Sequence, residues 1–289
     1  MRSIRVKLFL QYTAPKKMLT ALAGVLANIK MIKIKNHLIR RFIQNYDVVM
    51  SEAVREHVED YVNFNDFFTR YLKPGSRPIA DADVISPVDG CVSEIGQIQQ
   101  GQLLQAKGRY YSVDELLACD EQKSAPFQRG SFATLYLSPR DYHRVHMPIA
   151  GTLQDMIHVP GALFSVQPDT VRHIPRLFAR NERVVLLFDT ALGPMAVVLV
   201  GATIVGKIGT CWQGDLPRVK KTTDFKNMLP ALAERSLQQA DEVGYFKLGS
   251  TAIILFSEHS KIEWTPELKA GVRVRLGEAL GMANVIEKK

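Results

Sequence analysis

The first candidate for chemistry in this sequence is a serine at the start of an apolar run. Ser250 follows Gly249 and opens the run Thr251 to Phe256, which is rich in Ile. Such a run indicates a buried strand, and a hydroxyl at the edge of a core needs a polar partner. Gly249 has no Cβ and tolerates strained backbone conformations. The pair fits either an ordinary turn before a core strand or a reactive serine, and the short motif alone favours the turn.

Two histidines three residues apart are the second candidates. His143 and His146 lie in the segment 138–148, which is closed by prolines and is expected to be mostly loop. A lone His-x-x-His pair is insufficient for zinc, and no Cys or further His lies close in sequence, so we expect no metal site. Histidine titrates near neutral pH without perturbation, and two of them on one loop therefore suit proton transfer.

An aspartate in a tight turn is the third candidate. Asp89 lies between Pro87 and Gly90, where the usual role of an aspartate is to bond its own backbone. An Asp, a His and a Ser from separate segments can also form a charge-relay triad on any fold. The spacing permits a triad of Asp89, His146 and Ser250 without requiring it.

Short β-branched segments bounded by glycine must position these side chains. We expect strands at 91–98, 131–137, 153–158, 183–189, 195–205, 251–256 and 272–276. Regular short strands with turn signals predict a β-sandwich or barrel-like domain. A charged helix is expected at 51–61, and Pro-Gly and Arg-Pro at 74–78 mark a boundary. The fold class is therefore α+β, with a helical arm at 1–62 and a β-rich catalytic domain at 63–289.

Composition and charge narrow the class of protein. The chain has 289 residues, of which 46% are hydrophobic and 23% charged, as in an ordinary globular protein. Three widely spaced cysteines indicate neither a disulfide framework nor a thiolate metal site. The net charge of +8 is uneven, because residues 1–46 carry ten basic and no acidic side chains. The remainder, with 27 basic against 29 acidic side chains, is close to neutral.

The basic arm is typical of a membrane-surface helix. Its apolar stretch 18–29 is shorter than the roughly 20 residues that a bilayer span requires. Lys35 intrudes on the apolar half of the next helix and could snorkel; that half contains Ile34, Leu38, Ile39, Phe42, Ile43 and Tyr46. A basic amphipathic segment without acids suits anionic lipid. Packing on the protein's own core is the main alternative, and nucleic acid is disfavoured because no aromatic-interleaved basic platform is present.

Six segments, taken in order, resemble the bacterial phosphatidylserine decarboxylases. These segments are 65–70, 86–90, 138–148, 160–166, 177–183 and 248–251. The likeness covers the chain from about residue 60 to its end, and each segment is weak alone. The arm resembles the family only in character, as a basic, membrane-associated helical region.

This resemblance implies a proenzyme that makes its own pyruvoyl group. In the family pattern, Ser250 Oγ attacks the carbonyl carbon of Gly249, and elimination then breaks the chain between residues 249 and 250. Ser250 is left as an N-terminal pyruvoyl group, the electron sink that decarboxylation of an amino acid needs and no side chain provides. His146 would deprotonate Ser250, Asp89 would orient His146, and His143 would supply the proton during turnover.

The same resemblance implies the partners and the location. Phosphatidylserine would be converted to phosphatidylethanolamine and carbon dioxide at an anionic membrane surface, without any nucleic acid. Fragments 1–249 and 250–289 would stay together as a heterodimer, alone or as a dimer of these. The protein would lie peripherally on the cytoplasmic side of the inner membrane, with Phe164 and Ser165 at the entrance for the lipid.

Two alternatives of other classes remain at this point. A serine hydrolase would use Asp89, His146 and Ser250 with water, although Ser250 lacks the G-x-S-x-G elbow of such enzymes. A non-enzymatic binding module is the other alternative, because the segment 271–281 resembles a hairpin of the lipoyl-type carrier domains. That segment has no lysine at its tip to modify.

Overall fold

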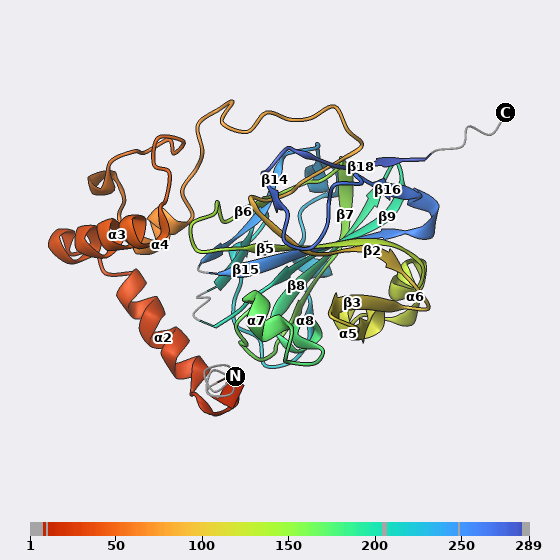
Figure 1. Ribbon diagram of the computed structural model, residues 1–289, viewed down its shortest axis with the longest axis horizontal. Coiled ribbons are helices and arrows are strands. Elements are labelled where there is room, and N and C mark those ends of the chain that lie inside the picture. Colours follow the sequence, from red (N-terminus) through yellow and green to blue (C-terminus); the bar gives the residue numbers. More distant parts are fainter. Residues whose placement is uncertain (1–7, 10, 204–206, 248, 285–289) are drawn as a thin grey trace.

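A nine-stranded antiparallel sheet forms the centre of the molecule (Figure 1). The structure is a computed structural model that describes residues 8–9, 11–203, 207–247 and 249–284. Its strands follow the order β12-β7-β8-β9-β15-β5-β2-β17, and β13 pairs with β7. They are β2 (Gly90–Ile98), β5 (Gly130–Leu137), β7 (Gly151–Val159), β8 (Arg183–Thr190), β9 (Gly193–Val200), β12 (Thr223–Asp224), β13 (Ser236–Leu237), β15 (Ser250–Ser257) and β17 (Arg273–Val274).

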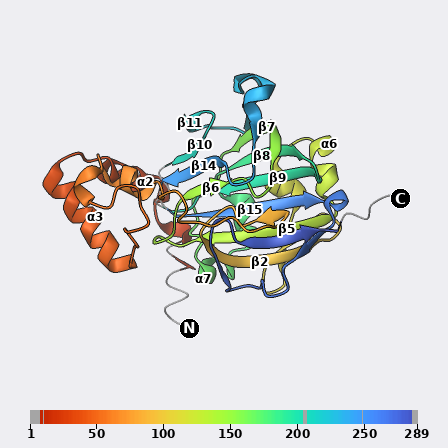
Figure 2. The same cartoon turned by 90° about the horizontal axis from the view of Figure 1, so that it is seen from above.

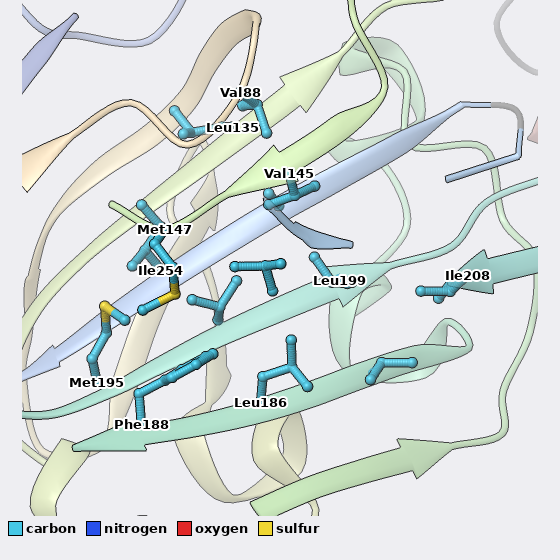
Figure 3. Close-up of a cluster of buried hydrophobic side chains, with 14 of the residues drawn as sticks. Val88, Leu135, Val145, Met147, Leu186, Phe188, Met195, Leu199, Ile208 and Ile254 are labelled. Atoms are coloured by element: carbon cyan, nitrogen blue, oxygen red, sulfur yellow. The ribbon is translucent and has the colours of Figure 1, made fainter. Parts of the chain in front are cut away.

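Strand β15 has core on both faces, which explains its continuous apolar sequence. Because successive side chains of a strand point to opposite faces, residues 252, 254 and 256 enter one hydrophobic cluster and 253 and 255 the other. Figure 3 shows Ile254 in the first cluster with Met195, Leu199 and Leu186 of neighbouring strands. The strand is also hydrogen-bonded along both edges, to β5 and to β9.

Smaller sheets cover one face of the central sheet. A four-stranded sheet has the order β11-β10-β14-β6 and a three-stranded sheet the order β1-β18-β16. Both contribute to the cluster around Ile254. Their strands are β6 (Arg144–His146), β10 (Lys207–Thr210), β11 (Gly214–Asp215), β14 (Glu242–Lys247), β1 (Val84–Ile85), β16 (Ile262–Trp264) and β18 (Ala279–Ala283).

Short helices and a hairpin cover the opposite face. Their apolar side chains form the second cluster together with residues 253 and 255 of β15. These elements are β3 (Gln102–Ala106), β4 (Arg109–Ser112), α5 (Val113–Leu117), α6 (Glu121–Ser124), η2 (Ala125–Phe127), α7 (Pro168–Val171) and α8 (Leu177–Arg180). Three further single turns are η3 (Lys226–Met228), η4 (Leu232–Arg235) and η5 (Glu258–Ser260).

The N-terminal helices form a separate group at one side of the sheets (Figures 1 and 2). They are α2 (Lys16–Ala27), α3 (Ile32–Tyr46), η1 (Val58–Asp60) and α4 (Phe64–Phe68). Ile39 of α3 is fully buried against Tyr61, Phe67 and Phe68. No helix in the described ranges is both long enough and apolar enough to cross a bilayer.

The arm exposes apolar side chains on α2 as well as on the face expected on α3, where Ile34 and Tyr46 are 38% and 42% exposed. Leu22 and Val25 of α2 are 59% and 69% exposed. Lys35 of α3 is only 4% exposed, and its Nζ donates to Asn36 Oδ1 at 2.7 Å and to the carbonyls of Val58 and Glu59 at 3.2 Å each. The expectation that Lys35 snorkels to solvent is therefore wrong, because three oxygens hold its ammonium group inside the protein.

The α+β class and the helical N-terminal region are confirmed. The sheets of the described residues stack without closing a barrel. Most expected strands are present, but 195–205 is a strand only to Val200 and 272–276 only at Arg273–Val274, while 204–206 lie outside the described residues. The segment 271–281 is not a hairpin, because β17 pairs with β2 and β18 with β1 and β16.

The charged helix expected at 51–61 is also wrong. The segment contains only the single turn η1. Tertiary contacts override its helical pattern, because Ala53 bridges to Leu72 and Arg55 makes a bidentate ion pair with Asp66 at 2.7 and 2.8 Å.

Candidate active site

Ser250 lies where the chain passes from the four-stranded sheet into the central sheet. Strand β14 ends at Lys247 and β15 begins at Ser250, which pairs with Leu137 of β5. Ser250 is fully buried, and its Oγ has no hydrogen-bond partner among the described residues. An unpaired buried hydroxyl is costly, and native proteins rarely keep one without a reason. The hydroxyls of Thr251, Thr134 and Tyr111 share this feature, so a reactive role for Ser250 also depends on its position after Gly249.

Gly249 adopts a backbone conformation that suits glycine. Its φ is +35°, in the left-handed region that residues with a Cβ avoid. A Cβ built on Gly249 would meet no atom within 4 Å. The structure therefore supports a conformational demand for glycine at this position. Leu248, the residue before it, lies outside the described residues.

The open space at Gly249 is a cavity of about 360 Å³. Phe68, Tyr136 and Ser165 line it from the body of the protein, while Phe42 and Tyr46 line it from α3. Ser165 thus shares a cavity with Gly249, and its place at a lipid entrance remains a prediction. Phe164 does not line this cavity, since its ring is buried beneath Lys16, whose Nζ is 3.7 Å from the ring centroid.

His143 lies directly behind the wall of this cavity. Its ring centroid is 4.1 Å from that of Phe68, and the residue is fully buried. Nδ1–H donates to the carbonyl of Asp141 at 2.8 Å, while Nε2 has no partner. Desolvation by burial lowers the pKa of His143 to about 3, so the ring is neutral at physiological pH.

His146 is also held as a neutral imidazole. Nδ1–H donates to the carbonyl of Ala240 at 2.7 Å, and the hydroxyl of Tyr142 donates to Nε2 at 3.1 Å. Burial lowers the pKa of His146 below its usual 6.5. Nε2 is thus the basic nitrogen. Sequence reasoning missed Tyr142, although a hydroxyl next to two histidines was visible in the same short segment.

Asp89 makes no hydrogen bond to either imidazole. Its Oδ1 and Oδ2 accept from Arg77 at 2.9 and 2.6 Å, and Oδ1 also accepts from the backbone N–H of Leu276 at 2.9 Å. The negative charge of Asp89 still raises the pKa of both His143 and His146 against the effect of burial. Arg77 was missed because its Arg-Pro sequence was interpreted only as a boundary signal.

The structure thus brings some of the expected residues together and leaves others apart. Phe68 and Gly249 line one cavity, and His143 packs against Phe68 behind its wall. No hydrogen bond connects Asp89 to His146, or His146 to Ser250, in the described part of the chain. The roles expected for Asp89, His143, His146 and Ser250 remain predictions.

Comparison with known proteins places this site in a family. A family model described as phosphatidylserine decarboxylase matches residues 64–282, and a second model, described as PSD, matches residues 6–47. The chain is 56% identical to the phosphatidylserine decarboxylase proenzyme of Legionella pneumophila (strain Corby), across 94% of this chain and 96% of the relative. It is 52% identical to the proenzyme of Acidovorax ebreus (strain TPSY), across 96% and 98%. Identity to the proenzyme of Pseudomonas fluorescens (strain Pf0-1) is 48%, across 97% and 99%. None of these three relatives bears the name of a serine hydrolase or of a lipoyl-type module.

The conformation of Gly249 predicts a stability difference between two glycine substitutions. In a Ser250→Ala background, Gly249→Ala should lower the free energy of unfolding by about 1–2 kcal/mol, because its positive φ disfavours a Cβ. Gly24→Ala, in helix α2 with equally open surroundings, should raise it by up to about 1 kcal/mol. Urea unfolding of both variants measures the difference. Equal effects at the two positions would contradict a conformational demand at Gly249.

Proposed function

The chain belongs to the phosphatidylserine decarboxylase family, and from this premise we propose that it generates a pyruvoyl group from its own Ser250. As a member, it converts phosphatidylserine to phosphatidylethanolamine and carbon dioxide. The observation that carries the proposal is the buried, unpartnered Ser250 Oγ, one residue after a glycine with positive φ and at the edge of a cavity. These residues fit the group, since the hydroxyl is free to react and the space before Gly249 is open.

The cutting step uses only atoms of this chain. Ser250 Oγ forms a bond to the carbonyl carbon of Gly249, the amide C–N bond breaks, and the peptide link becomes an ester with a free amine on residue 250. Loss of the α-proton of residue 250 breaks its Cβ–Oγ bond and leaves a carboxylate on Gly249. The resulting dehydroalanine takes up water and releases ammonia. The pyruvoyl group then supplies a ketone that holds the substrate amine and accepts electrons as carbon dioxide leaves.

His146 serves as the base for the cutting step in this proposal. A lowered pKa keeps its imidazole neutral and able to accept the Ser250 proton. Nε2 is engaged by Tyr142 in the uncut chain, so the transfer requires that this hydrogen bond be exchanged for one to Ser250. Asp89 stabilises the resulting cation by its charge, without the direct hydrogen bond that the triad analogy implied.

His143 serves turnover in this proposal. Its place behind Phe68 sets it beside the cavity that receives the lipid headgroup. The ring is neutral in the uncut chain and has no proton on Nε2 to give. An anionic headgroup in the cavity raises the pKa of a nearby imidazole, so substrate binding itself would prepare His143 to carry a proton.

The arm delivers the lipid in this proposal. Residues 1–62 form the membrane-associating arm and 63–289 the catalytic domain, with α2 presenting its exposed apolar side chains to an anionic membrane surface. Phe42 and Tyr46 of α3 belong to the cavity wall at Gly249, so the arm also shapes the lipid entrance. We place the protein peripherally on the cytoplasmic side of the inner membrane.

The two fragments should remain associated after the cut. Fragment 250–289 begins with β15, which pairs with β5 and β9, both in fragment 1–249. We therefore propose a heterodimer of these fragments as the active unit, either alone or as a dimer.

Intact mass and a denaturing gel test the cut itself. Active protein should separate into 1–249 and a 40-residue fragment 250–289 with a ketone at its N-terminus, and not run as one chain of 32.4 kDa. Ser250→Ala should stay uncut and inactive, because no oxygen remains to attack. Ser257→Ala, at the other end of the same buried strand, is the matched control and should still be cut. Full activity in an uncut Ser250→Ala chain would overturn the mechanism.

The two histidines should fail at different stages. His146→Ala should slow cutting by about 10²- to 10⁴-fold, the usual contribution of a positioned base. His143→Ala should be cut normally and then lose turnover by a similar factor, while Asp89→Asn should slow cutting more mildly. Cutting of the unsubstituted chain should stay constant as the pH falls to about 6.5 and decline only below, because a base with a lowered pKa remains unprotonated down to that pH.

The control for this experiment is His173→Ala. His173 also bonds a carbonyl through Nδ1, that of Asp169, but it is exposed. Gel analysis of cutting and measurement of carbon dioxide release should be run in parallel for all four variants. An uncut His143→Ala chain beside a normally processed His146→Ala chain would show that the two roles are reversed.

Exposed side chains of α2 test the membrane proposal without disturbing α3. Leu22→Gln with Val25→Gln should weaken binding to anionic vesicles by about tenfold or more per side chain, since each apolar group leaves the lipid. Met228→Gln with Leu232→Gln, at equally exposed positions outside the arm, is the matched control. High salt should weaken binding further. Identical vesicle binding by the two double variants would contradict a role for α2.

A further inference from the structure

A second cavity, of about 250 Å³, lies near the cavity at Gly249. The two cavities draw on neighbouring residues of the same three segments: Tyr46 and Asp47, Phe68 and Arg70, and Pro139 and Arg140. Asp89 and Tyr142 also line the second cavity. It therefore adjoins the site without containing Gly249 or Ser250.

Four carboxylates (Asp47, Glu52, Asp89 and Asp141) and five arginines line this cavity. Three of the arginines face carboxylates: Arg77 pairs with Asp89 and Glu52, Arg273 with Asp141 at 2.6 Å, and Arg275 with Glu52 at 3.6 Å. Arg70 and Arg140 form no ion pair with any described residue. Two guanidinium charges at the cavity are thus left without a carboxylate in contact.

Of these two arginines, Arg70 gives the stronger evidence for a bound anion, because its charged group is buried. It is 4% exposed, and its Nη2 donates to the carbonyl of Arg140 at 3.2 Å. Its Nε and Nη1 have no hydrogen-bond partner among the described residues, and the guanidinium lies 5.6 Å from the centroid of the Phe67 ring. Burial lowers the pKa of the Arg70 guanidinium, as expected for a charge that is poorly compensated inside the protein. Native proteins seldom leave such groups unsatisfied unless something else binds them.

We propose that Arg70 and Arg140 form a binding site for a phosphate group. The planar fork of guanidinium N–H donors matches the oxygens of a phosphate, and a cavity wall that carries two such groups favours an anion. The assignment to the substrate rests on the proposed function. In phosphatidylserine the amine and the carboxylate share one carbon, so both must lie at residue 250, whereas the phosphate is attached further along the headgroup. One methylene and one ester oxygen separate the phosphate from that carbon, so a headgroup phosphate at Arg70 and Arg140 requires this cavity to lie close to residue 250.

Binding can be measured apart from catalysis in the uncut Ser250→Ala chain. Isothermal titration with inorganic phosphate and with glycerophosphoserine supplies two probes, one for free phosphate and one for the lipid headgroup. Arg140→Gln should weaken the binding of at least one probe by about 10- to 100-fold, the usual effect of losing a charged hydrogen bond. Arg140 is exposed, so its substitution should not disturb folding. Arg218→Gln, at another exposed arginine without an ion pair in the described part of the chain, should leave binding unchanged.

Substitutions of Arg70 provide a second test of the phosphate site. Arg70→Gln should abolish binding, while Arg70→Lys should restore part of the affinity, because the charge returns without the bidentate fork. Circular dichroism spectra that match the parent chain identify variants that have folded. Phosphate binding that is the same in Arg140→Gln, Arg218→Gln and a folded Arg70→Gln variant would overturn the site.

Kinetics of the processed enzyme distinguish the two sources of phosphate. If the headgroup occupies the site, Arg140→Gln should raise KM for phosphatidylserine with kcat retained, and glycerophosphoserine should lose affinity with inorganic phosphate. If free phosphate is the ligand, only inorganic phosphate binding should fall, and KM should stay unchanged. Either result supports the site. Normal cutting of Arg140→Gln beside a raised KM would also separate this site from the self-cleavage machinery.

Discussion

The rest of the structure depends on the double burial of strand β15. Core residues cover both of its faces, and β5 and β9 occupy both of its edges. Its first residue, Ser250, is consequently sealed from water while the chain before it turns out of the sheet. A serine in that position has lost its hydration without gaining a partner. The packing that forms the sheet therefore also removes water from the Ser250 hydroxyl, and a polar group without water or a partner is energetically unfavourable.

The same lack of water determines the charge state of the groups around the site. His143 and His146 are neutral because burial outweighs the nearby charge of Asp89. Asp89 itself is committed to Arg77, and Arg77 to Glu52. The carboxylate therefore acts on the histidines at a distance and through its field, which differs from the directly bonded aspartate of a hydrolase triad.

Features that depend on neighbouring residues in the sequence could be predicted, whereas contacts between distant segments could not. Strands such as β15 and β5 depend on local patterns of apolar residues, so the sequence predicted their first and last residues almost correctly. The Arg77–Asp89 pair joins segments twelve residues apart, and the contact of Tyr142 with His146 depends on how one loop folds. Lys35 looked like a surface residue because two of its three oxygen partners, the carbonyls of Val58 and Glu59, come from a distant segment and not from the helix. Local pattern thus identified the candidate residues, while tertiary packing decided their partners.

A cut at the head of a central strand has a consequence for how the protein persists. If the chain is cut as proposed, its last 40 residues carry the central strand β15 but no longer share a backbone with the neighbouring strands β5 and β9. Unfolding then becomes a dissociation, and refolding depends on the concentration of two separate pieces. The cut protein cannot refold from one continuous chain, as its precursor did. Its lifetime is therefore set by the rate at which the sheet opens and the fragments separate, more than by an equilibrium with an unfolded chain.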